Sequence, residues 1–188
     1  MAKVLYPGSF DPITKGHMNI VAQASELFDE VVIAIMQNPS KNSGFFTLDE
    51  RLELIRKLYE KVDNIKVVKG SGASVHVAML NGCEAIIRGL RGLTDFDYEI
   101  GLANINKQMS ENKIRTICLF AESDYQFVSS SMVKEIYNLD KDITRYVDPY
   151  IYEAMKRKSN MLEDNIQINK KRAKVMVRKR RYESKNIR

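Results

Sequence analysis

The feature that most constrains the fold of this chain is the apolar run Val31-Val32-Ile33-Ala34-Ile35-Met36. Successive side chains of a β-strand point to opposite faces of the sheet, so both faces of this strand would be apolar. A strand of that kind is typical of the centre of a parallel sheet that helices cover on both sides. The run therefore predicts a layered α/β domain.

Other strand-like runs alternate with helical patterns along the chain. The expected strands are Lys3–Tyr6, Val31–Met36, Ile65–Lys69, Glu84–Arg88 and Ile114–Phe120, and the expected helices lie near 17–28, 48–61, 73–81, 95–110, 130–138 and 150–158. This alternation predicts a Rossmann-like, doubly wound parallel sheet of about five strands with right-handed crossovers. Thr47 and Glu50 have capping-box spacing, and Gly82 predicts a helix end.

The positive charge of the chain is concentrated at its C-terminus. The formal net charge is +6, but residues 170–188 hold ten Lys or Arg against one acid, so residues 1–169 carry a net charge of −3. The core pattern fades after Ser159. We therefore predict one folded domain over 1–158 and a basic C-terminal extension, helical or disordered, over 159–188.

Several classes of protein are disfavoured by composition. No apolar run approaches the ~20 residues that a membrane helix requires, and the N-terminus lacks a signal-peptide pattern. Cys83 and Cys118 have no paired spacing and fall in stretches expected to be buried strands, so we expect reduced core thiols. These features predict a soluble, cytoplasmic protein.

The stretch from Tyr6 to His17, Tyr-Pro-Gly-Ser-Phe-Asp-Pro-Ile-Thr-Lys-Gly-His, leads from the first expected strand into the first helix. Its glycines let backbone N–H groups approach an anion, and the helix directs its positive end to the same place. A histidine there can donate a hydrogen bond to phosphate oxygens. No acid or cysteine nucleophile accompanies His17, so the stretch predicts a site that holds a triphosphate while another molecule attacks it. His76 has no such setting and is expected to be structural.

Two arginines emerge from the fourth expected strand, Arg88 at its end and Arg91 just after it, each with a glycine after it. A guanidinium group can donate two hydrogen bonds at once to a phosphate. Asp95, Asp97 and Glu99 could form structural ion pairs instead. We expect such a pair for one arginine but not for both.

Three serines, Ser129 to Ser131, open the helix after the fifth strand and present hydroxyl and N–H groups that suit an anion. One serine is enough to cap a helix, and no serine has a histidine–acid partner at suitable spacing, which argues against a serine hydrolase. Lys41 follows the second strand and Ser74 the third. Because ligands of such sheets bind at the carboxyl ends of the strands, all these residues are expected to share one site.

The three motifs together resemble bacterial phosphopantetheine adenylyltransferases over residues 2–158. The first motif alone would indicate only the wider nucleotidyltransferase superfamily with its T/HxGH signature. The resemblance implies transfer of the adenylyl group of ATP to 4′-phosphopantetheine, which gives dephospho-coenzyme A and pyrophosphate. It further implies Mg²⁺ carried with ATP, direct attack on the α-phosphate, a homohexamer, and feedback inhibition by coenzyme A.

The resemblance also implies roles for individual residues. His17 would stabilise the transition state. The ATP side would comprise Ser9, Phe10, His17, Gly89, Leu90, Arg91, Glu99, Tyr125, Gln126, Phe127, Val128, Ser129, Ser130 and Ser131. The acceptor side would comprise Ser9, Lys41, Ser74 and Arg88. The segment around Ser74 is more polar than the family pattern, and the tail after Ser159 has no counterpart in it.

Two other functions stay open at this point. Another nucleotidyltransferase, such as a nicotinate-mononucleotide adenylyltransferase or a cytidylyltransferase, would share the first motif. A nucleic-acid-binding protein could use the basic tail, since clustered Lys and Arg release counterions on binding. Only Tyr182 offers stacking within 170–188, so a solvated extension is preferred.

Overall fold

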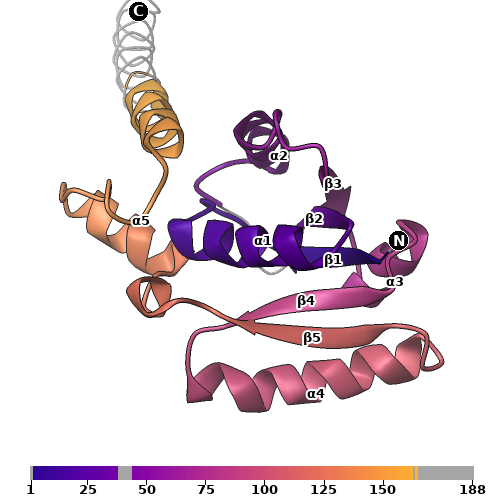
Figure 1. Ribbon diagram of the computed structural model, residues 1–188. Helices are drawn as coiled ribbons and strands as arrows, with labels where there is room; N and C mark the ends of the chain where they lie inside the picture. The colour runs from indigo at the N-terminus through magenta and orange to yellow at the C-terminus, as the bar shows by residue number, and fades with distance from the viewer. Residues whose placement is uncertain (1, 38–43, 163, 165–188) are drawn as a thin grey trace, which may run out of the picture. The chain divides into compact units, whose positions relative to one another are not determined.

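The computed structural model describes residues 2–37, 44–162 and 164 (Figure 1). The chain forms two compact units, Met1–Ile151 and Tyr152–Arg188. The described residues of the second unit are helical, and the helix begins at residue 149. Most of the basic tail lies outside the described residues, so the division at residue 158 and the state of the tail stay predictions.

The first unit alternates strands and helices, as the sequence predicts. The elements are β1 (Lys3–Gly8), α1 (Lys15–Leu27), β2 (Glu30–Met36), α2 (Leu48–Leu58), β3 (Ile65–Gly70), α3 (Ser74–Leu80), β4 (Ala85–Leu90), α4 (Leu93–Met109), β5 (Arg115–Phe120), the 3₁₀ turn η1 (Ser123–Tyr125) and α5 (Ser130–Asn138). Thr47 and Glu50 form the expected capping box of α2, and Gly82 has φ +66° just beyond α3. None of the helices in the described ranges has the length and apolar character needed to span a bilayer.

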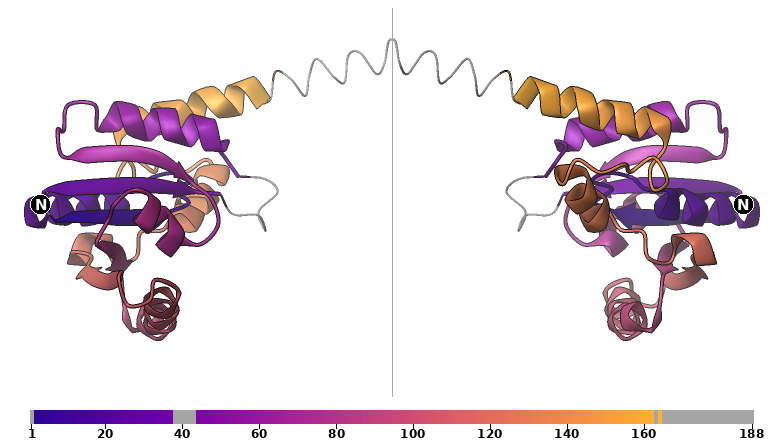
Figure 2. Two further views of the ribbon diagram at one scale, coloured as in Figure 1. Left: turned by 90° about the vertical axis from the view of Figure 1, so that its right-hand side faces the viewer. Right: turned by 90° about the vertical axis from the view of Figure 1, so that its left-hand side faces the viewer.

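The five strands form one parallel sheet in the order β3-β2-β1-β4-β5. The order reverses at β1, because β2 lies on one side of it and β4 on the other. The carboxyl ends of β1 and β4 therefore flank the position at which parallel α/β sheets bind ligands. Figure 2 shows from both sides that α5 lies at the end of the sheet opposite the N-terminus, where the strands have their carboxyl ends.

Strand periodicity assigns the two faces of the sheet. Leu5, Val32 and Ile86 share one face and pack in a buried cluster with Val75 and Ala78 of α3. The other face meets α1. A Cβ added at Gly89 on that face would lie 2.9 Å from Cγ1 of Ile20, so α1 approaches β4 closely only because residue 89 is glycine.

Two expectations about the strands were wrong. The fourth strand was expected to end at Arg88, but β4 extends to Leu90. Cys118 was expected to be buried, but β5 is an edge strand and the Cys118 thiol is exposed. Cys83 is buried, as expected, but precedes β4 rather than lying within a strand. Burial raises the pKa of the Cys83 thiol to about 11, so it stays protonated at neutral pH.

Helix α4 lies along β5 at one edge of the sheet (Figure 1). Its apolar side chains are distributed around the helix rather than confined to one face. The exposed ones are Phe96, Tyr98, Ile100, Ile105 and Met109, and Phe120 at the end of β5 is exposed as well.

Candidate active site

The first turn of α1 is closed by a reciprocal pair of hydrogen bonds between Thr14 and His17. The N–H of His17 donates to Oγ1 of Thr14 at 3.4 Å, and the N–H of Thr14 donates to Nδ1 of His17 at 3.1 Å. This is a capping box in which histidine replaces the usual Glu or Gln. The imidazole ring is thereby fixed over the amino end of the helix, where partial positive charge favours an anion.

The surroundings of His17 determine the protonation state of its imidazole ring. His17 is half-buried, and this desolvation together with the nearby positive charge of Arg91 lowers the pKa of His17 to about 4. The ring is therefore neutral at pH 7. Because Nδ1 accepts the Thr14 N–H, the single proton of the neutral ring sits on Nε2. His17 thus offers one N–H donor to a ligand and no positive charge of its own.

The side chain of Phe10 packs against the imidazole ring of His17. The Phe10 ring is only 1% exposed and packs edge-on against the rings of Tyr6 and His17, with centroid distances of 5.4 and 5.2 Å. Its φ of +48° lies in the left-handed region, which costs a bulky residue conformational energy. A Cβ added at Gly8 would lie 2.8 Å from the Phe10 ring, so glycine is needed there for space.

Arg88 points to the face of the sheet that carries α4, and its guanidinium group is held by Glu99. Nε and Nη2 of Arg88 donate to the two carboxylate oxygens of Glu99 at 2.7 and 2.6 Å, and Nη1 donates to the Pro7 carbonyl at 3.4 Å. The Glu99 side chain is 8% exposed and that of Arg88 is 26% exposed. The arginine is therefore held in one orientation, and Nη1 retains one further N–H donor.

Arg91 is paired as well. Its Nε and Nη2 donate to Asp95 at 3.1 and 3.3 Å, and its backbone N–H donates to the same carboxylate at 3.1 Å. The expectation that only one of the two arginines would be in a structural ion pair was wrong. Pairing does not exclude phosphate binding, because the side chain of Arg91 is 44% exposed and retains donors.

The serine segment reaches the first motif through two contacts. Oγ of Ser130 donates to the carbonyl of Pro12 at 2.8 Å. A Cβ at Gly16 would lie 3.5 Å from the carbonyls of both Tyr125 and Val128, so the backbone of this loop lies against the first turn of α1. The amino ends of α1 and α5 therefore lie close together, and both direct N–H groups toward an anion.

The side chains of the three serines have different environments. Oγ of Ser129 accepts the N–H of Met132 at 3.1 Å and caps α5, Ser130 binds the first motif, and Ser131 is exposed. Beside them Gln126 and Phe127 are exposed, and Tyr125 is half-buried. The exposed side chains are available to a ligand at this edge of the sheet.

The predicted acceptor side also includes Lys41, Ser74 and Ser9. Lys41 lies outside the described residues, and its phosphate contact stays a prediction. Ser74 is half-buried at the first residue of α3, beyond β3 at the sheet edge. Ser9 follows β1 directly, and its carbonyl accepts a hydrogen bond from Nη1 of Arg51 at 2.6 Å.

A family model described as cytidylyltransferase-like matches residues 5–136. A relative from Alkaliphilus metalliredigens (strain QYMF), named phosphopantetheine adenylyltransferase, is 41% identical over 155 residues, which cover 82% of this chain and 98% of the relative. A relative of the same name from Heliobacterium modesticaldum (strain ATCC 51547 / Ice1) is 42% identical over 158 residues, covering 84% and 93%. This chain belongs to the phosphopantetheine adenylyltransferase family.

A solved structure supports the fold of this family member. A crystal structure from Vibrio parahaemolyticus, described as a candidate nicotinate-nucleotide adenylyltransferase, superposes with a TM-score of 0.56 and 16% identity, covering 82% of this chain and 99% of that one. The similarity confirms the Rossmann-like α/β architecture.

Three residues that shape the site were given no role of their own from the sequence. Thr14 is the hydrogen-bond partner of His17, and its position three residues before His17 at a helix start was the signal for that role. Asp11 and Arg51 make contacts between segments distant in sequence, and no local pattern predicts those.

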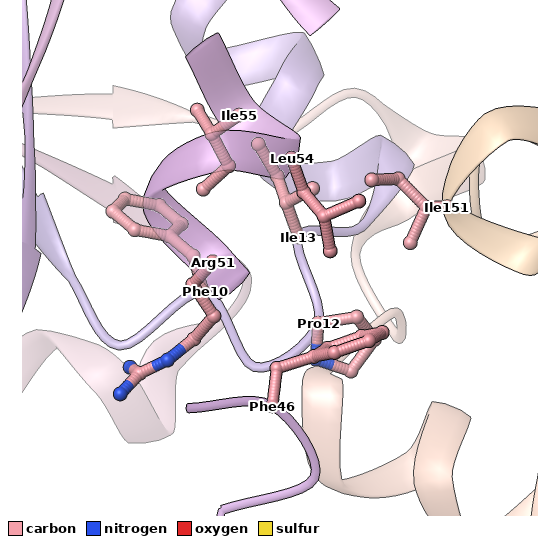
Figure 3. Close-up of a pocket in the computed structure, with 8 residues that line it drawn as sticks. All are labelled: Phe10, Pro12, Ile13, Phe46, Arg51, Leu54, Ile55 and Ile151. Atoms are coloured by element: carbon pink, nitrogen blue, oxygen red, sulfur yellow. The ribbon is translucent and has the colours of Figure 1, made fainter. Parts of the chain in front are cut away.

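The described residues of the protein also line a small hollow beneath the first motif (Figure 3). Its lining is mostly apolar and comprises Phe10, Pro12, Ile13, Phe46, Arg51, Leu54, Ile55 and Ile151. The guanidinium group of Arg51 points away from the apolar side chains. The hollow has no room for a water molecule, so it is part of the packing under the motif and not a ligand pocket.

Proposed function

We infer that the chain is a nucleotidyltransferase that transfers the adenylyl group of ATP to 4′-phosphopantetheine, giving dephospho-coenzyme A and pyrophosphate, a step of coenzyme A biosynthesis. The observation that carries the chemistry is the neutral His17 imidazole, which presents Nε2–H at the amino end of α1. The acceptor is supported by the two relatives at 41% and 42% identity, both named phosphopantetheine adenylyltransferase.

We propose a direct displacement without a covalent enzyme intermediate. A phosphate oxygen of 4′-phosphopantetheine forms a bond to the α-phosphorus of ATP, while the bond from that phosphorus to the pyrophosphate oxygen breaks. His17 donates Nε2–H to an α-phosphate oxygen as charge develops there, and Arg91 adds positive charge nearby. A fixed neutral donor suits this role because its hydrogen bond requires no rearrangement during the reaction.

The remaining residues hold the two substrates. The amino end of α5, with the exposed Ser131, binds the leaving phosphates of ATP, and the loop from Tyr125 to Val128 borders the nucleotide. Arg88, oriented by Glu99, binds the phosphate of the acceptor through Nη1, and Lys41 and Ser74 are proposed on the same side.

Mg²⁺ bound to the triphosphate would neutralise phosphate charge and favour departure of pyrophosphate. Asp95 and Glu99, the acids beside the two arginines, both accept hydrogen bonds from guanidinium groups. This supports a metal that arrives with ATP rather than one held by these carboxylates.

A homohexamer and feedback inhibition by coenzyme A complete the proposal. The exposed apolar side chains of α4 and Phe120 of β5 support self-association, because such a surface is costly to leave in water. Light scattering after size-exclusion chromatography would measure the mass of the assembly and so test the hexamer.

Coenzyme A shares its pantetheine and phosphate groups with the product, so it should compete with 4′-phosphopantetheine. A cytoplasmic enzyme is supported by two free cysteines, and nucleic-acid binding by the basic tail stays a prediction.

The decisive experiment measures pyrophosphate release from ATP with 4′-phosphopantetheine, nicotinate mononucleotide or no acceptor. Turnover only with 4′-phosphopantetheine is expected, and turnover with nicotinate mononucleotide instead would refute the proposal in favour of the alternative enzyme. His17→Ala should lower kcat by about 10²–10³-fold, as removal of one transition-state donor does, with ATP affinity little changed. His76→Ala, which removes the only other histidine, is the matched control and should retain full activity.

A further inference from the structure

Asp11, a residue with no role in the proposed chemistry, joins three segments at the edge of the active site. Its Oδ1 accepts the N–H of Phe46 at 2.8 Å, and its Oδ2 accepts the N–H of Phe45 at 2.8 Å. The same Oδ2 forms an ion pair with Nζ of Lys134 at 3.3 Å. The residue is only 7% exposed, so these contacts replace most of the water that a carboxylate would otherwise bind.

Each of the three segments is connected to a part of the site. Asp11 itself lies in the first motif, between Ser9 and His17. Lys134 lies on α5, one turn after the serines that open this helix. Phe45 precedes α2, and its ring packs edge-on against Tyr137 of α5, with centroids 5.8 Å apart.

The segment that contains Gly44 and Phe46 approaches the carboxylate of Asp11 closely. A Cβ added at Gly44 would lie 2.9 Å from Oδ2 of Asp11 and 2.9 Å from the carbonyl of Phe46. Glycine therefore lets the chain present two successive N–H groups to a single carboxylate. Hydrogen bonds to an ionised acceptor are about twice as strong as neutral ones, so the negative charge is what makes Asp11 suited to this junction.

We propose that Asp11 is a positioning residue for the reaction: it fixes α5 relative to the first motif, so that the amino end of α5 and His17 act on the same triphosphate. The inference rests on the proposed function of this site. Ser130 makes the only other side-chain bond described between α5 and the motif, to Pro12, and it lies a full turn before Lys134. The two contacts lie one turn apart along α5, so together they constrain both the position and the tilt of this helix relative to the first motif.

The test compares Asp11→Asn, Lys134→Met and the double variant. In Asp11→Asn an amide N–H₂ group faces either a backbone N–H or the lysine, so the junction loses its charge at nearly unchanged volume. We expect kcat/KM for ATP to fall about 10- to 100-fold, as an error of about 1 Å in positioning can cost 10²-fold. KM for 4′-phosphopantetheine should change much less.

Lys134→Met keeps both backbone contacts of Asp11 and supplies an answer if Asp11→Asn does not fold. It should also lower kcat/KM for ATP, and the double variant should lose less than the product of the single losses, because both substitutions break one contact. Glu30→Gln is the control: it removes a 2.8 Å ion pair with Lys3 at the amino ends of the strands and should leave the kinetic constants unchanged.

ATP binding, measured by calorimetry with a non-hydrolysable analogue, separates this inference from the proposed function. If the wild-type chain binds ATP but turns over no 4′-phosphopantetheine, the function fails while the effect of Asp11→Asn on ATP binding still tests the inference. Wild-type kcat/KM and ATP affinity in the folded Asp11→Asn variant would overturn the positioning role. Fully multiplicative losses in the double variant would overturn it as well, since the two residues would then act independently.

Discussion

Replacement of Glu99 by glutamine offers the sharpest test of how the acceptor side of the site is held. The glutamine side chain would keep the size of the original and one carbonyl acceptor. Its amide N–H₂ group would face the guanidinium group of Arg88, which needs two acceptors at 2.6 and 2.7 Å. The substitution therefore leaves one partly buried cation without its counter-ion.

The expected loss of stability follows from the exposure of the two side chains. Removing one partner of a fully buried ion pair costs about 3–5 kcal/mol, whereas an exposed pair contributes about 0–1 kcal/mol. The Glu99 side chain is 8% exposed but that of Arg88 is 26% exposed, which lets water reach the stranded cation. We therefore expect Glu99→Gln to cost about 2 kcal/mol, between these limits. For a chain of this size the Tm should fall by about 4–8 °C.

The assay pairs thermal unfolding with steady-state kinetics. Glu111→Gln, which removes an exposed pair with Lys113, is the matched control and should change stability by less than about 0.5 kcal/mol. Because Glu99 fixes the plane of the Arg88 guanidinium group, KM for 4′-phosphopantetheine should rise more than KM for ATP. Equal Tm shifts in the two variants would show that the Arg88–Glu99 pair is energetically no different from a surface pair. A larger rise in KM for ATP would show that Glu99 serves the nucleotide directly.

Four further predictions concern His17, the packing beneath it and the C-terminal tail. Carbon and nitrogen NMR of the His17 imidazole, assigned by its loss in a His17→Gln variant, should report the Nε2–H tautomer with a titration midpoint near pH 4. A midpoint near 6.5 would contradict the depressed pKa, and an Nδ1–H tautomer would contradict the capping-box assignment. The depressed pKa of His17 stabilises the fold above about pH 6.5, and this stabilisation should be lost as pH falls from there toward 4. Gly8→Ala should cost about 1–3 kcal/mol and lower kcat, because its methyl group displaces the Phe10 ring that supports His17; a calorimetric Tm equal to wild type would refute this. Deletion of residues 160–188 should leave kcat/KM nearly intact, and a large loss of activity would reveal a role for the tail.

Local sequence patterns were sufficient to predict the fold. The apolar run in β2 predicted a central strand, and β2 lies inside the sheet with every residue from Val31 to Ile35 buried. Thr47 and Glu50 predicted the start of α2 correctly, since a capping box depends only on neighbours along the chain. β4 was predicted to end two residues early, because Gly89 is a poor strand former by itself and is explained only by the approach of Ile20.

The partners of charged side chains were predicted less well. Both arginines of the second motif are paired, Arg88 with Glu99 and Arg91 with Asp95, although only one such pair was expected. The spacing of Glu99 and Asp95 on α4 shows that they share a helix face, but not that this face packs beside the end of β4. Exposure of Cys118 was missed for the same reason: an apolar strand has the same pattern whether a helix covers it or it lies at an edge.

The amino-acid sequence alone determined the order of strands and helices along the chain, because backbone propensity, side-chain periodicity and capping act between neighbours in the chain. It also supplied the residue types that are proposed to meet a phosphate. Tertiary structure decided the tautomer and pKa of His17, the pairing of both arginines, and the junction at Asp11. Those properties depend on burial and on the distance between charges from separate segments. Such distances exist only after β1 and β4 have paired and brought α1, α4 and α5 together.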